Sequence, residues 1–150
     1  MNKRFIKGKI IKIVSDSENG TTKVDVKWTI DFSRLPQMRF LLDFISYSFT
    51  NEDFISIDPT LGYIGNDHYD SFTFTTTASS KVSDKDTFNE DTGYHIALMR
   101  NQKKAIHTYN KLINVINNKI DKYFKKPLDI IRMNNDFDIF NLFMKLNKYN

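Results

Sequence analysis

The segment from Asn66 to Asp70 holds the densest set of side chains in this chain that can do chemistry. It reads Asn-Asp-His-Tyr-Asp, so two carboxylates and an imidazole lie close together, and Asp58 precedes them. Carboxylates and imidazoles bind divalent cations and transfer protons. One hypothesis is therefore a metal-dependent hydrolase that uses Asp58, Asp67, His68 and Asp70. A solvated turn is the simpler interpretation, because Asn and Asp are common in loops of any kind.

A row of basic side chains in the second half of the chain forms another candidate site. Winding this region as a helix at about 100° per residue separates a basic side from an apolar side. Cations along a helix suit phosphates or an acidic protein surface. The candidate ligand-binding residues are Arg100, Lys103, Lys104, His107 and Lys111. A solvated helix face opposite a buried one is the simpler interpretation.

The charge distribution offers a third hypothesis. The net charge is only +4, but residues 51–91 carry nine acids against two lysines, and residues 100–126 carry eight basic side chains against one acid. Acidic loops of one copy that meet the basic helix of another would assemble the chain head to tail. The sequence is therefore also compatible with a homo-oligomeric structural protein, for example in a virion.

Other kinds of chemistry leave no trace in the sequence. The absence of cysteine excludes disulfides, thiolate zinc sites and cysteine nucleophiles, and fits a reducing, cytoplasmic compartment. No phosphate-binding glycine loop, nucleophile elbow or zinc-protease motif is present. The histidines His68, His95 and His107 are scattered. We therefore expect a non-enzymatic protein without a cofactor, and no stretch that spans a membrane.

Two strands that form a hairpin are predicted at the start of the chain. β-branched residues occur from 4 to 14, and the polar turn at 16–20 ends in Asn-Gly, which suits a type I′ turn. The return strand alternates apolar with polar residues, and its apolar row consists of Val24, Val26, Trp28, Ile30 and Phe32. Trp28 with Phe72 and Phe74 has the composition of a base-stacking platform, but its place on the apolar row favours core packing.

The middle of the chain predicts a helix and two short strands. Residues 34–49 have helical spacing, with Ser33 as a cap and Pro36 in the first turn, although their aromatic content also fits a strand. Residues 54–57 are expected to form a strand, 58–70 a loop and 71–77 a second strand.

The second half predicts one long amphipathic helix. Thr87 and Glu90 match a capping box, so the helix should begin near Phe88. Its apolar side carries Ala105, Tyr109, Leu112, Ile113, Ile116, Ile120 and Tyr123. Pro127 is expected to end it. A last helix capped near Asn135 or Asp136 follows.

The helix entry resembles a pattern in small uncharacterised tailed-phage proteins. The stretch from Asp86 to Arg100 reads D-x-F, four residues, Gly, three residues, Ala, then a basic residue, over about a tenth of the chain. Physically, Phe88 is expected to plug the core, and Gly93 and Ala97 to let the helix lie close to the sheet. The resemblance implies an accessory role, such as inhibition of host defence, in which Arg100 and Lys104 face phosphates.

These observations predict a single α+β domain over 1–150, mainly β over 1–77 with one helix, and mainly α over 87–150. An N-terminal antiparallel sheet would pack against one long C-terminal helix, and a short terminal helix would complete the core. The predicted function is a phage-type accessory protein in the host cytoplasm that binds an anionic partner: a nucleotide signal, a nucleic acid or an acidic protein. The self-assembling virion protein is the alternative, and the hydrolase is the third hypothesis.

Overall fold

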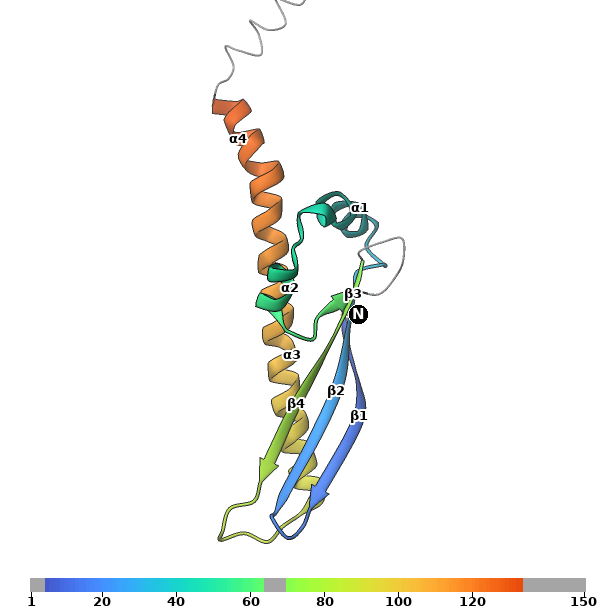
Figure 1. Cartoon of the computed structure of the whole chain (residues 1–150), viewed down its shortest axis with the longest axis vertical. Helices are drawn as coiled ribbons and strands as arrows, with labels where there is room; N and C mark the ends of the chain where they lie inside the picture. The colour runs from blue at the N-terminus through green and yellow to red at the C-terminus, as the bar shows by residue number, and fades with distance from the viewer. Residues whose placement is uncertain (1–4, 64–69, 134–150) are drawn as a thin grey trace, which may run out of the picture. The chain divides into compact units, whose positions relative to one another are not determined.

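The computed structural model describes residues 5–63 and 70–133. The chain forms two compact units, Met1–Asn114 and Val115–Asn150. The predicted α+β class is confirmed: an antiparallel sheet from the first half accompanies one long helix from the second (Figure 1). Among the described residues, no helix combines the length and the apolar character needed to cross a membrane.

The first unit is built on a four-stranded antiparallel sheet in the order β1-β2-β4-β3. Three strands have eleven residues each and pair along their length, whereas the fourth has two. Their bounds are β1 Ile6–Asp16, β2 Thr21–Asp31, β3 Gly62–Tyr63 and β4 Ser71–Lys81. β1 is an outer strand, and its residues from Lys7 to Ser15 are all exposed.

The predicted hairpin joins β1 to β2, but its turn is not of type I′. That turn needs a positive φ at both central residues, and among the described residues Gly20 is the only one with a positive φ, at 60°. The Asp16 carboxylate shapes the turn instead. It accepts hydrogen bonds from the backbone amides of Glu18 (3.0 Å) and Asn19 (3.1 Å). Hydrogen bonds from Asn19, the side chain first, lower the pKa of Asp16.

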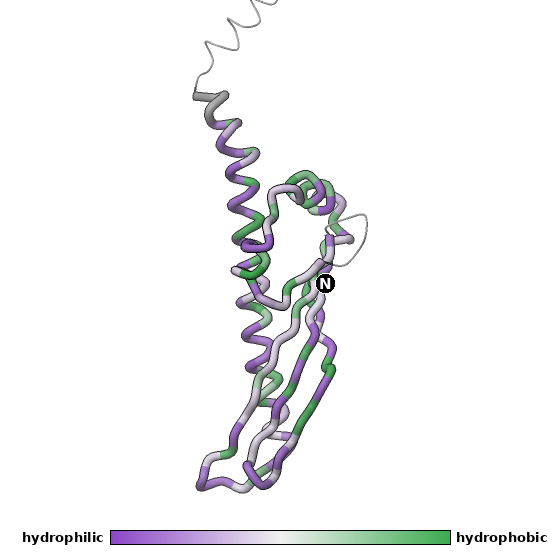
Figure 2. The backbone as a smooth tube through the Cα atoms, viewed as in Figure 1, coloured by the Kyte–Doolittle hydropathy of each residue, from purple (hydrophilic) through white to green (hydrophobic). Residues whose placement is uncertain are grey.

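The apolar row predicted on β2 forms the core of the first unit. Every second residue from Val24 to Phe32 is buried, and Phe72 and Phe74 of β4 are buried beside them. Figure 2 shows hydrophobic and hydrophilic residues alternating along the hairpin. The Trp28 ring covers Gly8, where a Cβ would lie 2.6 Å from the indole. The aromatic rings are therefore core, and the base-stacking platform considered for them is ruled out.

Three short helices connect β2 to β3. α1 spans Pro36–Ile45 and is followed by the 3-10 turn η1, Ser46–Ser48, so the helix predicted over 34–49 is confirmed. Its cap position is Leu35, which makes no side-chain cap hydrogen bond, rather than Ser33. The Ser33 amide donates to the Asp31 carboxylate at 2.9 Å.

The strand predicted at 54–57 is wrong, because these residues belong to the helix α2, Asn51–Ile57. A capping box starts it: the Thr50 hydroxyl accepts from the Asp53 amide (3.2 Å), and the Asp53 carboxylate accepts from the Thr50 amide (2.9 Å). These two bonds satisfy amides that a helix start leaves without partners. An apolar run of four residues fits a helix as well as a strand, and here the cap decides.

The long helix α3 spans Glu90–Ile120, and Asn89 caps it. The side-chain oxygen of Asn89, Oδ1, accepts a hydrogen bond from the Thr92 amide at 3.0 Å. The predicted cap at Thr87 is therefore wrong. A turn that precedes it, in which the Asp86 amide donates to the Ser83 carbonyl (3.0 Å), keeps this segment out of the helix. Phe88 is half-buried at the helix entry rather than a fully buried plug.

Small and polar residues of α3 lie directly against the sheet. A Cβ on Gly93 would lie 2.6 Å from Thr22 Oγ1, and Ala97 is fully buried, so the close approach predicted for these two residues is confirmed. The Ser80 hydroxyl donates to the Gly93 carbonyl at 2.7 Å. Thr22 Oγ1 has no partner among the described residues.

A buried polar chain fixes the register of α3 on the sheet. The Trp28 indole donates to Thr76 Oγ1 (2.8 Å), and the Thr76 hydroxyl donates to Asn101 Oδ1 (2.7 Å). The Asn101 amide then donates to the Val24 carbonyl (2.9 Å), and Asn101 is completely buried. Each of these four residues therefore has a hydrogen-bond partner for the polar group it contributes, as buried polar groups require.

The prediction that Pro127 ends the long helix is wrong, because helical structure continues past Pro127 in the second unit. The α-helical pairing ends at Ile120, and the π-helical turn η2, Asp121–Lys125, leads into α4, Lys126–Met133. The Lys126 amide donates to the Asp121 carbonyl, five residues back. Pro127 is thus the second residue of α4, directly after the π-helical turn. The last helix predicted from Asn135 or Asp136 lies outside the described residues.

Candidate anion-binding site

The candidate site begins at the outer edge of β4. β3 pairs only with Thr73 and Phe72 of β4. Beyond this short pairing, no strand of the described ranges lies beside Thr75, Thr77 and Ser79 on the side of β4 that faces away from β2. Such an edge needs other partners, because unpaired main-chain groups invite a foreign strand.

Side chains of α3 and of the α2–β3 loop provide these partners. Arg100 Nη1 donates to the Ser79 carbonyl, and Lys104 Nζ donates to the Thr77 carbonyl. The Thr75 amide donates to Thr60 Oγ1 at 2.9 Å. Four residues of a helix advance about 6 Å along its axis, which is close to the roughly 6.8 Å that two residues advance along a strand. Basic residues four apart therefore match alternate carbonyls.

All five predicted binding residues line two hollows along this edge. The first, of about 500 Å³, is lined by Ala78, Ser79, Arg100, Lys103, Lys104 and His107. The second, of about 470 Å³, adds Lys111, Thr75 and Thr77, and shares Lys104 and His107 with the first. We call this surface the basic groove, defined by Arg100, Lys103, Lys104, His107 and Lys111. All five side chains are exposed.

The groove carries an excess of unneutralised positive charge. Within the described ranges, Lys103 and Lys111 form neither an ion pair nor a hydrogen bond, and no carboxylate pairs with Arg100 or Lys104. Asp58 lines the second hollow. Its Oδ1 accepts from the Thr60 amide (2.8 Å) and hydroxyl (2.6 Å), and its carboxylate offsets one of the positive charges of the groove.

Acidic residues gather at the entry of α3, away from the groove residues in sequence. Asp84, Asp86, Glu90 and Asp91 are all exposed. Glu90 accepts a hydrogen bond from the Ser15 hydroxyl (2.9 Å), and Asp86 accepts one from Ser83 (2.6 Å). The charge separation noted in the sequence thus lies on exposed surface.

The residues of the hydrolase hypothesis are not assembled within the described ranges. Asp67 and His68 lie outside them. Asp58 holds the α2–β3 turn, and Asp70 forms an ion pair with Arg39 at 3.7 Å. Among the residues that the structure describes, no three His, Cys, Asp or Glu side chains are arranged to hold a metal ion. His95 contacts the Asp91 carbonyl of its own helix (2.6 Å).

The sequence predicted the five basic residues but missed their main-chain partners and the loop that completes the groove. The alternation of residues along β4 does not indicate which of its edges is left unpaired, because strand order depends on the whole fold. Comparison with protein-family models, with curated proteins and with solved structures finds no match to this chain.

Proposed function

We propose that this chain is a non-enzymatic accessory protein that binds an anionic partner through the basic groove. The observation that carries the proposal is the pair Lys103 and Lys111, which line the groove without a partner in the described part of the chain. Capping of the β4 edge explains Arg100 and Lys104, but it does not explain these two lysines. Ligand binding accounts for all four cations.

The tethering of Arg100 and Lys104 supports the same function. Their cationic groups are held on main-chain carbonyls, so less side-chain freedom remains to be lost when an anion arrives. Both heads keep donors for a ligand, because a guanidinium has five N–H groups and an ammonium has three. The groove is therefore partly organised for phosphates before they bind.

The likeness of Asp86 to Arg100 to a tailed-phage pattern adds the biological setting to the proposal. A phage accessory protein in the host cytoplasm, such as an inhibitor of host defence, needs no catalytic centre if it sequesters its target.

The test uses inorganic polyphosphate, labelled with a fluorophore and followed by anisotropy. Lys103→Glu with Lys111→Glu should weaken binding at least tenfold. The matched control, Lys7→Glu with Lys12→Glu on exposed β1, changes the net charge equally and should weaken it less than threefold. Equal losses in both variants would mean that net charge alone attracts the probe, and would refute a groove.

Self-assembly is the second candidate function, and the exposed acids at the α3 entry favour it. Asp84, Asp86, Glu90 and Asp91 of one copy offer carboxylates to the groove of another. Size exclusion with light scattering at low and high salt separates the two functions, because exposed charges are screened within about 8 Å at physiological ionic strength. An oligomer that dissociates in salt and carries no excess absorbance at 260 nm supports assembly.

A further inference from the structure

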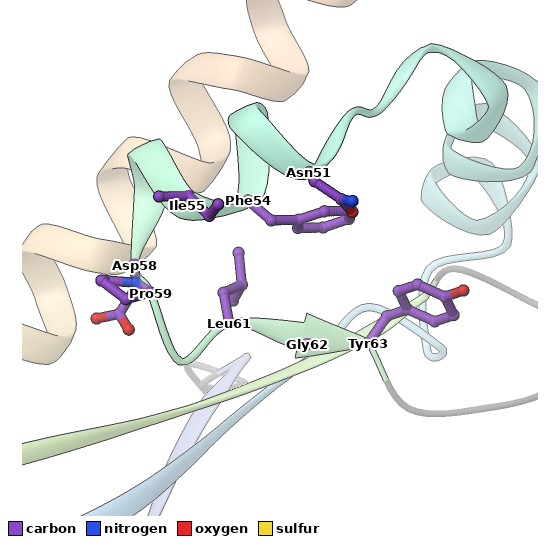
Figure 3. Close-up of a pocket in the computed structure, with 8 residues that line it drawn as sticks. All are labelled: Asn51, Phe54, Ile55, Asp58, Pro59, Leu61, Gly62 and Tyr63. Carbon is purple, nitrogen blue, oxygen red and sulfur yellow. The ribbon is translucent and has the colours of Figure 1, made fainter.

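A third hollow lies beside the basic groove and differs from it in chemistry. It has a volume of about 520 Å³, lies between α2 and β3, and is lined by Asn51, Phe54, Ile55, Asp58, Pro59, Leu61, Gly62 and Tyr63. Figure 3 shows Phe54 and Leu61 pointing toward one another, with Tyr63 farther along β3. Ile55 and Tyr63 are 63% and 47% exposed.

This third hollow, which we call the aromatic hollow, adjoins the basic groove. Asp58 and Pro59 line both the third hollow and the second hollow of the groove. A path from Arg100 and Lys103 past Lys111 to the rings therefore passes Pro59 and the Asp58 carboxylate, which line both hollows. Cations line one end of this path, and aromatic and aliphatic side chains line the other.

The rings at the apolar end form a short series. The Phe49 and Phe54 rings are stacked with centroids 5.6 Å apart, and the Phe54 and Tyr63 rings are tilted by 36° with centroids 6.3 Å apart. Aromatic faces of this kind are platforms on which nucleobases stack. The Asn51 amide, at the start of α2, adds a donor and an acceptor for a base edge (Figure 3).

We propose that the basic groove and the aromatic hollow together bind single-stranded nucleic acid, with phosphates on α3 and at least one base on Phe54 and Tyr63. This inference rests on the proposed function and names its ligand class. Proteins that bind single strands combine a positive channel with aromatic platforms. A duplex keeps its bases stacked inside, so it offers phosphates to the groove but no base to the hollow.

The length of the path selects a strand over one nucleotide. From Arg100 to Lys111 the helix advances about 16 Å, and the aromatic hollow lies beyond. Four cations along this distance are more than one nucleotide needs. An acidic peptide would use the groove but would have no flat partner for the rings.

The test compares three labelled probes of equal length by anisotropy: a twelve-residue oligothymidine, the same sugar-phosphate chain without bases, and a duplex. The oligothymidine should bind at least fivefold more tightly than the abasic chain and the duplex. Tyr63→Ala should weaken oligothymidine binding at least fivefold, the lower range for one stacked base, and leave abasic binding unchanged. Circular dichroism checks that each variant is folded.

The matched control is Tyr47→Ala, because Tyr47 is 72% exposed on η1 and does not line the hollow. It should leave both affinities unchanged. Equal binding of abasic and base-bearing strands, an effect of Tyr47→Ala as large as that of Tyr63→Ala, or tighter binding of the duplex would overturn the inference while the anion-binding function stands. If no probe binds and polyphosphate fails as well, both proposals fall.

Discussion

Replacing Asn101 by leucine tests whether the buried polar chain between α3 and the sheet stabilises this fold. Leucine has a similar size but cannot hydrogen-bond. The Thr76 hydroxyl would lose its acceptor at 2.7 Å, and the Val24 carbonyl would lose a donor at 2.9 Å. Each buried group left without a partner costs about 1–3 kcal/mol.

The expected net loss is about 2–4 kcal/mol, because added apolar burial offsets part of the cost. This is a large share of the roughly 5–15 kcal/mol that stabilises a typical domain. The assay is urea unfolding followed by the fluorescence of Trp28, the only tryptophan in the chain and itself a member of the polar chain.

Two further variants decide the interpretation. Thr108→Val removes another buried hydroxyl of α3, whose contact with Asp58 is long at 3.5 Å, so it should cost less than about 1 kcal/mol. Asn101→Leu with Thr76→Val should cost less than the sum of the two single changes, because both remove the same bond. An Asn101→Leu variant as stable as the wild type, with an unchanged dependence on urea, would refute the reasoning.

Three other predictions follow from the same structure. Gly93→Ala should destabilise the chain by about 1–2 kcal/mol, because overpacking costs more than the gain in helix propensity. Adding Thr22→Ala should restore part of this stability, because it removes the oxygen that lies 2.6 Å from the added Cβ. Thermal unfolding of the single and double variants checks both expectations. Hydrogen bonds from Ser33 lower the pKa of Asp31 below its usual value, so Asp31 stabilises the fold above pH about 4 and this contribution is lost as the pH falls through the lowered pKa. The stability difference between wild type and Asp31→Asn should therefore be largest near neutral pH and vanish in acid, and a constant difference would contradict it. The slope of log affinity for oligothymidine against log salt should be about −2.8 for four groove cations and about −1.4 after Lys103→Ala with Lys111→Ala.

Strong local patterns made much of the fold predictable. The strict alternation on β2 reflects a strand with one buried face, and the helical spacing after Arg34 survives as α1. The Gly93 and Ala97 spacing correctly indicated close packing of α3 on the sheet, because only small side chains permit it.

Local signals that compete explain the errors. Thr87 and Asn89 are both good caps, and the turn at Ser83 to Asp86 selects Asn89. The short run at 54–57 fits two structures, although Thr50 and Asp53 carried the capping box that distinguishes them. The π turn before Pro127 depends on pairing five residues apart, which apolar periodicity does not report.

The candidate site was predictable only in part. The helical projection placed the basic side chains together, since spacing along a helix is a local property. The hydroxyls and carbonyls of β4 enter the groove because β3 stops after two residues, and this depends on strand order. The aromatic hollow joins β3 to α2, whose residues 54–57 were predicted to form a strand.

The shortness of β3 has a consequence for how this surface can change. A longer β3 would pair with Thr75, Thr77 and Ser79 and so occupy the same carbonyls that hold Lys104 and Arg100. The carbonyls of Thr77 and Ser79 can therefore pair with a longer β3 or hold the basic side chains of the groove, but not both. An insertion that extended β3 until it paired with Ser79, six residues beyond Thr73 on β4, would release both basic side chains into solvent and close this edge of the sheet.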